Sequence, residues 1–177
     1  MKKGFIQSTL CCIVLITAIM PFGLYAQSSV AKDTIYVAAR EIMKETTYCG
    51  LVTIDSTGQP QMRTMNPFPA NDEFITWFAT SRSSRKVLEI KANPKVCVYY
   101  ADHTSAKGYV SITGTAEVID DKALLVKMKR GYWESIPDWQ NNFVLIKVMT
   151  VTMDVINYKH GLVNDPKTFR APSVIFK

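Results

Sequence analysis

The segment Thr80-Ser81-Arg82-Ser83-Ser84-Arg85-Lys86 joins a predicted strand to a predicted helix, and it places hydroxyls and cations at their junction. The mostly apolar run Glu73–Thr80 predicts the strand, and the helix is expected to begin near Ser84. Free backbone N–H groups and the partial positive charge of a helix N-terminus favour an anion, to which Arg85 and Lys86 would add charge-assisted hydrogen bonds. The segment therefore predicts a phosphate site, although by itself it is more often a Ser-capped, solvated helix start.

The sequence on either side of this segment predicts a domain rich in β-strands. Leu51–Asp55 and Gln61–Met65 read as two strands joined by a hairpin turn, in which Gly58 can adopt a positive φ. Three more strands are expected at residues 95–100, 109–118 and 143–149. The last of these is apolar enough to be buried on both faces.

Two further helices and an apolar tail complete the predicted elements. Asp33–Thr47 carries apolar residues at a helical period, with Asp33 expected as its N-cap. Another helix is expected to begin at Asp120-Asp121. The C-terminal Val174-Ile175-Phe176 is apolar, and it is expected to dock on another part of the protein.

The order of these residues resembles a known family, the FMN-binding split barrels of the pyridoxamine 5′-phosphate oxidase type, and within it the general stress protein 26-like branch. The resemblance covers roughly Ile35 to Tyr158: a strand Arg, then Thr-x-x-x-Ser-Arg-Lys, then Asn-Pro-x-Val, then a strand with Gly-Thr-Ala-Glu-Val. Each piece is weak by itself, and their order and spacing make the combination specific. The resemblance implies a β-barrel with flanking helices (α+β), and a homodimer that binds FMN between its subunits.

The resemblance also implies which residues bind the cofactor. Arg63 and the turn Ser84-Arg85-Lys86 are expected at the FMN phosphate, and Ala79 and Thr80 match the strand end beside the flavin. Tyr109 falls where the family brings a polar side chain toward the flavin. The complete set expected to bind the cofactor is Arg63, Thr64, Met65, Asn66, Ala79, Thr80, Ser84, Arg85, Lys86 and Tyr109. No catalytic residue and no metal ligand is assigned.

Other positions depart from the true oxidase. Phe68 lies about where the family's pyridoxamine phosphate site uses a Lys, and Arg170-Ala171-Pro172 lacks the His of the family's C-terminal Arg-x-His. Val155-Ile156-Asn157 stands where several relatives place an aromatic residue near the cofactor. Because a buried substrate phosphate needs cationic partners, the resemblance carries over the cofactor and not the vitamin chemistry.

The N-terminus has the outline of a secretory signal peptide. Lys2-Lys3 precede an uncharged run, Gly4–Ala26, whose centre is apolar. Cleavage after Ala26 would leave 27–177 as a single domain, exported to the periplasm or cell envelope and free of the membrane. A retained N-terminal anchor is the alternative, because Leu24 is not a small residue. The net charge of +6, from which cleavage removes two lysines, suits an anionic cofactor and does not require nucleic acid.

The cysteines and histidines leave two classes of function open. Cys49 and Cys97 occupy apolar strand positions and are expected to be buried free thiols, with a disulfide as the alternative in an exported protein. His103 and His160 fall in polar turns and are expected to be exposed.

The first hypothesis for the function is an FMN-dependent oxidoreductase acting on an unknown small molecule. The second is a non-catalytic binding module for haem or another flavin-like ligand, in which a His or a Tyr would be the axial ligand.

Overall fold

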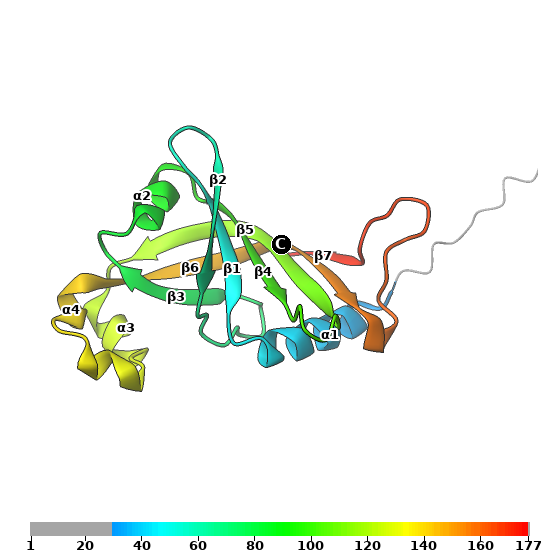
Figure 1. Cartoon of the computed structure of the whole chain (residues 1–177), viewed down its shortest axis with the longest axis horizontal. Coiled ribbons are helices and arrows are strands. Elements are labelled where there is room, and N and C mark those ends of the chain that lie inside the picture. Colours follow the sequence, from blue (N-terminus) through cyan, green and yellow to red (C-terminus); the bar gives the residue numbers. More distant parts are fainter. Residues whose placement is uncertain (1–29, 177) are drawn as a thin grey trace, which may run out of the picture.

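The computed structural model describes residues 30–176, and the predicted signal peptide at 1–26 therefore lies outside the described residues. Figure 1 shows that the described chain forms one curled sheet with helices around it. Within this part of the chain, no helix is long and apolar enough to span a membrane.

Seven strands form a single antiparallel sheet in the order β2-β1-β4-β5-β6-β3, and β7 pairs with β6. Their bounds are β1 (Cys49–Ile54), β2 (Pro60–Met65), β3 (Thr76–Ser81), β4 (Lys95–Ala101), β5 (Gly108–Ile119), β6 (Phe143–Asn157) and β7 (Ser173–Ile175). The sheet curls into a half-barrel with β2 and β3 as its outer strands (Figure 1). After β2 the chain returns to β3, where the Phe68 N–H donates to the Trp77 carbonyl oxygen at 2.8 Å. The predicted barrel with flanking helices is confirmed, and its opening lies between β2 and β3.

Helices flank this sheet. Their bounds are α1 (Lys32–Glu45), α2 (Arg85–Ala92), α3 (Lys122–Lys127) and α4 (Trp139–Asn142), with 3-10 turns η1 (Gly131–Ser135) and η2 (Tyr158–His160). The predicted N-cap of α1 was wrong: Ala31 holds the cap position and Asp33 lies in the first turn. Asp121, by contrast, caps α3 by accepting a hydrogen bond from the Leu124 N–H at 3.0 Å.

The core has two parts, which lie on opposite faces of β6. The larger part fills the barrel with alternate residues of the strands, such as Leu51, Val98 and Ile112, and α1 packs its apolar stripe against them. The smaller part is built on Leu125, Trp133, Trp139 and Leu145. Val144, Leu145 and Ile146 are all buried, as the sequence predicts for a strand covered on both faces.

Strand β6 is longer than the sequence predicts, because it continues past Met149 along the whole of β5. The pairing shifts register between Thr113 and Gly114. A Cβ at Gly114 would lie 2.3 Å from the Met149 carbonyl oxygen, so the close approach of the two strands requires glycine there. The apolar tail docks as predicted: β7 pairs with β6, and Val174 is buried.

Strand β3 begins at Thr76 rather than at Glu73. Asn71 accepts hydrogen bonds from the backbone N–H groups of Glu73 and Ile75, at 3.1 and 2.8 Å, and so forms a turn. Phe74, with a φ of 59°, leaves the extended conformation within that turn. Its apolar character reflects a buried position in the core, not strand pairing.

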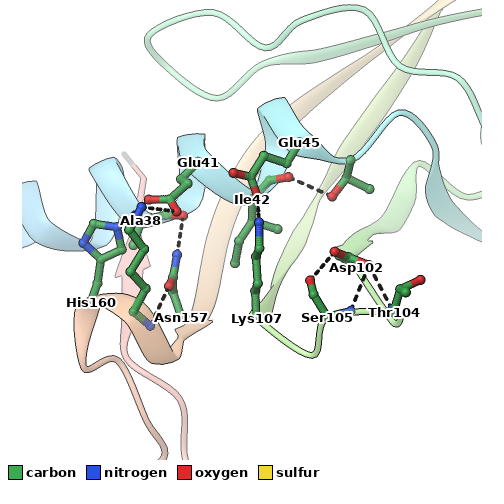
Figure 2. Close-up of polar contacts among 12 residues, drawn as sticks. Ala38, Glu41, Ile42, Glu45, Asp102, Thr104, Ser105, Lys107, Asn157 and His160 are labelled. Carbon is green, nitrogen blue, oxygen red and sulfur yellow. Dashed lines mark hydrogen bonds and ion pairs between the residues drawn. The ribbon is translucent and has the colours of Figure 1, made fainter.

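Polar contacts fix α1 to the ends of the sheet (Figure 2). Glu41 accepts from Lys159 Nζ and pairs with His160 Nε2, both at 2.7 Å, while Asn157 donates to the Ala38 carbonyl oxygen at 3.2 Å. The prediction of an exposed His160 was therefore wrong, because the carboxylate of Glu41 holds its half-buried ring against α1.

Candidate functional site

The end of β2, the end of β3 and the first turn of α2 meet at one corner of the barrel. Arg63 lies opposite Leu51 in the β1–β2 pairing, and the two side chains therefore share the inner face of the sheet. Lys86 Nζ donates to Thr80 Oγ1 at 2.9 Å, and the hydroxyls of Thr80 and Ser84 lie 3.3 Å apart. The structure thus brings together Arg63, Ser84 and Lys86, which were expected at a phosphate, with Thr80, which was expected beside the flavin. We call this group of residues, together with Arg85 and Glu89, the cation corner.

Glu89 is the member of the cation corner that sequence reasoning missed. Its carboxylate is 8% exposed, and it accepts hydrogen bonds from Arg63 Nη2 at 2.8 Å and from Thr53 Oγ1 at 2.5 Å. Burial raises the pKa of Glu89, but these hydrogen bonds outweigh burial and hold the pKa below its ordinary value. Arg63 also donates to Thr53 Oγ1 and to the Gln61 carbonyl oxygen. The guanidinium is consequently fixed on several sides.

The cation corner carries an excess of positive charge. Burial lowers the pKa of Lys86, and the neighbouring charges of Arg63 and Arg85 lower it further. The negative charge of Glu89 raises this pKa, but by less. Three cations thus face one carboxylate, and an anion placed among them would relieve their repulsion. Although Ser84 holds the N-cap position of α2, its hydroxyl makes no cap hydrogen bond and instead contacts Thr80. Hydroxyl and ammonium donors therefore converge where the first turn of α2 begins.

The other residues expected at the cofactor lie elsewhere. Thr64 is exposed, Met65 is buried in the larger core, and Ala79 packs against the smaller one. Asn66 lines a cavity of about 430 Å³ between α1 and the connection from β2 to β3. Tyr109 packs against Tyr99 on the outer face of the sheet, with tilted rings whose centroids lie 5.5 Å apart.

Tyr109 borders a second cavity, of about 460 Å³, together with Asp154 and residues of the C-terminal segment such as Arg170. Burial raises the pKa of Tyr109, and the charge of Asp154 adds to this effect. No contact in the described residues joins Tyr109 to the cation corner of the same chain. Its expected role at the flavin stays a prediction.

Phe68 occupies an apolar position, as its side chain suggests. Its ring meets Trp133 edge-on at 6.3 Å, and the Arg130 guanidinium lies 4.2 Å from its centroid. Arg130 also donates to the Pro67 carbonyl oxygen at 2.6 Å. The cation nearest to Phe68 is therefore already engaged with the ring and the backbone.

The cysteines and histidines offer no metal centre within residues 30–176, where no three His, Cys, Asp or Glu side chains gather to hold an ion. Cys49 and Cys97 are both free thiols; Cys49 is buried, and Cys97 is half-buried. His103 is exposed, as predicted, and its ring stacks on Tyr99 with centroids 6.3 Å apart.

Comparison with known proteins gives one family and several similar structures. The matching family model is described as pyridoxamine 5′-phosphate oxidase, and it covers residues 37–167. General stress protein 26 from Bacillus anthracis str. Sterne is 24% identical, with 68% of this chain and 92% of that chain covered and a TM-score of 0.59. None of the curated proteins compared with the chain matches it.

Two further structures share the fold at lower identity. A protein related to general stress protein 26 from Clostridium acetobutylicum is 16% identical, with 81% of this chain and 96% of that chain covered and a TM-score of 0.66. A heme binding protein from Mycobacterium smegmatis is 13% identical, with 82% of this chain and 60% of that chain covered and a TM-score of 0.59. At these identities the likeness concerns the fold alone.

Proposed function

The chain belongs to the pyridoxamine 5′-phosphate oxidase family, and from this membership we propose that it binds FMN and acts as an oxidoreductase on a small molecule. From the signal-peptide outline of the N-terminus we propose that it is exported. The observation that carries the proposal is the cation corner, where Arg63, Ser84 and Lys86 converge around a surplus of positive charge. A phosphate ester is the anion that matches several converging N–H and O–H donors.

The residues of the cation corner fit a phosphate in both charge and geometry. Glu89 and Thr53 hold the Arg63 guanidinium in place, so little side-chain entropy is lost when it binds. Lys86 supplies a second charged donor, and the Ser84 hydroxyl and the first-turn N–H groups of α2 supply neutral ones. Bound FMN would supply hydride or electron transfer, while the protein binds and orients it.

Pyridoxamine 5′-phosphate is a poor candidate for the substrate. Phe68 replaces the expected Lys with a packed aromatic ring, and Arg130 is engaged by that ring and by Pro67. Neither residue therefore supplies the free cation that a second phosphate dianion at Phe68 would need, and one exposed ammonium, Lys44, would have to balance it alone. We propose that the flavin serves another substrate.

Haem binding is the competing proposal. It is supported by the heme binding protein from M. smegmatis, whose structure shares the fold. It would require an axial ligand. His160 is paired with Glu41, and His103 lies in an exposed turn, so neither histidine faces the cation corner. The absorption spectrum of the purified protein distinguishes the two ligands, because flavin and haem absorb differently.

The first prediction is that the protein binds FMN more tightly than riboflavin. Arg63→Ala or Lys86→Ala should weaken FMN binding roughly ten- to a hundredfold, because each removes a charge-assisted hydrogen bond to the phosphate. Flavin fluorescence quenching measures both affinities, and Lys91→Ala, at an exposed site late in α2, is the matched control. Equal affinities for FMN and riboflavin would rule out the phosphate assignment.

A further inference from the structure

The cavity of about 430 Å³ beside α1, which we call the α1 cavity, is separate from the cation corner but lies close to it. Asn66, on its wall, follows β2 and stands three residues after Arg63. Three extended residues span roughly 10 Å. The volume falls within the range of about 300–1,000 Å³ that is typical of small-molecule sites.

One wall of the α1 cavity is aromatic and rigid. Phe68 is packed from behind by Arg130 and Trp133, with centroid distances of 4.2 and 6.3 Å. Phe74 is fully buried, and its ring lies under the Arg40 guanidinium at 4.6 Å. Neighbouring side chains hold both rings, and Phe68, which is partly exposed, is the ring that a flat apolar group could contact.

Two cations also line the α1 cavity. Arg40 and Lys44 lie one turn apart on α1, and both line the cavity. Arg40 is partly neutralised, since it pairs with the exposed Asp72 at 3.2 Å and donates to that residue's carbonyl oxygen at 3.0 Å. Lys44 has no hydrogen-bond or ion-pair partner in the described part of the chain. The α1 cavity therefore offers one free monovalent charge and one accessible aromatic ring, that of Phe68.

We propose that the α1 cavity binds a small aromatic monocarboxylate, with its ring against Phe68 and its carboxylate at Lys44. A single free ammonium matches a carboxylate better than it matches a phosphate dianion. That this acid is the substrate of the bound flavin rests on the proposed function. The binding of the acid itself does not rest on the proposed function, because no residue of the cation corner lines the cavity.

Calorimetric titration of the flavin-free protein with 2-naphthoate tests the proposal, with the neutral 2-naphthamide as the matched ligand. The acid should bind at least severalfold more tightly than the amide. Lys44→Gln should weaken the acid about three- to tenfold and leave the amide unchanged, because an exposed charge pair contributes modestly. Lys44→Arg should retain the affinity, and Lys95→Gln, at the far end of β4 from the cavity residue Tyr100, should have no effect.

Equal binding of acid and amide, an unchanged affinity in Lys44→Gln, or no binding of either ligand to the folded protein would each overturn the proposal. FMN affinity is measured on the same preparations. A protein that binds 2-naphthoate but not FMN supports the α1 cavity as an acid site and removes the proposed function. A protein that binds FMN but not 2-naphthoate overturns the acid site and leaves the proposed FMN binding standing.

Discussion

Arg63 and Glu89 form the ion pair on which the candidate phosphate site depends. Both side chains are largely shielded, with 19% and 8% exposed, so solvent and salt screen the pair only weakly. Glu89 fixes the guanidinium in place, and it also neutralises part of the charge that an anion would meet. The same carboxylate therefore orients Arg63 and competes with a phosphate for it.

Glu89→Gln separates these two effects, because the amide keeps an acceptor for Thr53 and loses the negative charge. We expect FMN to bind about three- to tenfold more tightly, since Arg63 no longer has a competing carboxylate. We also expect the free energy of unfolding to fall by about 1–3 kcal/mol, since a shielded cation loses its partner. Flavin titration and thermal unfolding measure the two effects, and Glu73→Gln, at an exposed site, should change neither.

The loss of stability in Glu89→Gln should depend on pH. The hydrogen bonds of Thr53 and Arg63 leave the pKa of Glu89 below 4.5, although burial alone would raise it. A carboxyl group with a lower pKa in the folded state stabilises the fold above its unfolded pKa, and this contribution is lost as the pH falls through the folded pKa. The stability gap between the native chain and Glu89→Gln should therefore narrow below pH 4.5. A constant gap from pH 7 to pH 3 would contradict the pairing.

Cys49 gives a further prediction at this scale. Burial raises the pKa of its thiol to about 12, so almost no thiolate is present at neutral or mildly alkaline pH. Iodoacetamide at pH 8 should leave Cys49 unmodified in the folded protein and should modify it after unfolding. Mass spectrometry of the alkylated peptides measures this. Equally fast alkylation in the folded and unfolded protein would show that the thiol is accessible.

Single residues were predictable from sequence where their role is local. Arg63, Ser84 and Lys86 belong to short motifs, and the structure brings them together as expected. Glu89 lies three residues after Lys86, a spacing equally typical of a solvated helix, and its burial depends on Thr53 and Arg63 from another part of the chain. No local pattern signals such a partner.

At the scale of elements, the β1–β2 hairpin depends on Asp55. Its carboxylate accepts from the backbone N–H groups of Thr57 and Gln59, at 2.8 and 3.0 Å, and from Gln61 Nε2 at 2.8 Å. Hydrogen bonds from Thr57 and Gln59 lower the pKa of Asp55 to about 2. The turn therefore holds Arg63, two residues beyond Gln61, in register with β1.

Asp55→Ala should lower the melting temperature at pH 7, because the turn loses these acceptors. Since the pKa of Asp55 is lower in the folded state, its contribution is present above an unfolded pKa near 3.8 and is lost as the pH falls toward about 2. The difference in melting temperature between the native chain and Asp55→Ala should thus shrink between pH 4 and pH 2. Ser56→Ala, in the same exposed turn, is the control, and an equal pH trend in both variants would contradict the assignment.

The elements themselves were predictable where periodicity and turn residues agree. The hairpin, the helix that follows Ser84 and the doubly buried start of β6 lie where the sequence places them. The predicted start of β3 was wrong because Phe74 is an apolar residue that packs in the core from a turn and does not belong to a paired strand. The length of β6 was missed because its second half pairs with β5 only beyond a bulge, in which β6 carries an extra residue, Val151, between the partners of Thr113 and Gly114.

At the scale of the whole molecule, the outer face of the sheet carries a continuous transverse row of side chains. The strand pairings join Met62, Val52, Cys97, Thr113, Thr152 and Ile175 in that order. The residues at the two ends of the row are apolar and exposed to solvent: Met62 is 73% exposed and Ile175 is 72% exposed. Apolar residues in such a row are typical of a surface that another protein covers. The family resemblance implies a homodimer, and we propose that the second copy of the chain covers this face.

The last prediction is that residues 27–177 form a homodimer through this face, which light scattering measures. Met62→Glu and Ile175→Glu should each produce monomers, because a twofold interface would bury the new charge twice. In these monomers FMN affinity should also fall, because the partner subunit would no longer complete each cofactor site. Val126→Glu, at an exposed position of α3, is the control and should leave the mass unchanged. A native protein that is monomeric and still binds FMN fully would exclude the shared site, and a dimer that both variants retain would place the interface on another face.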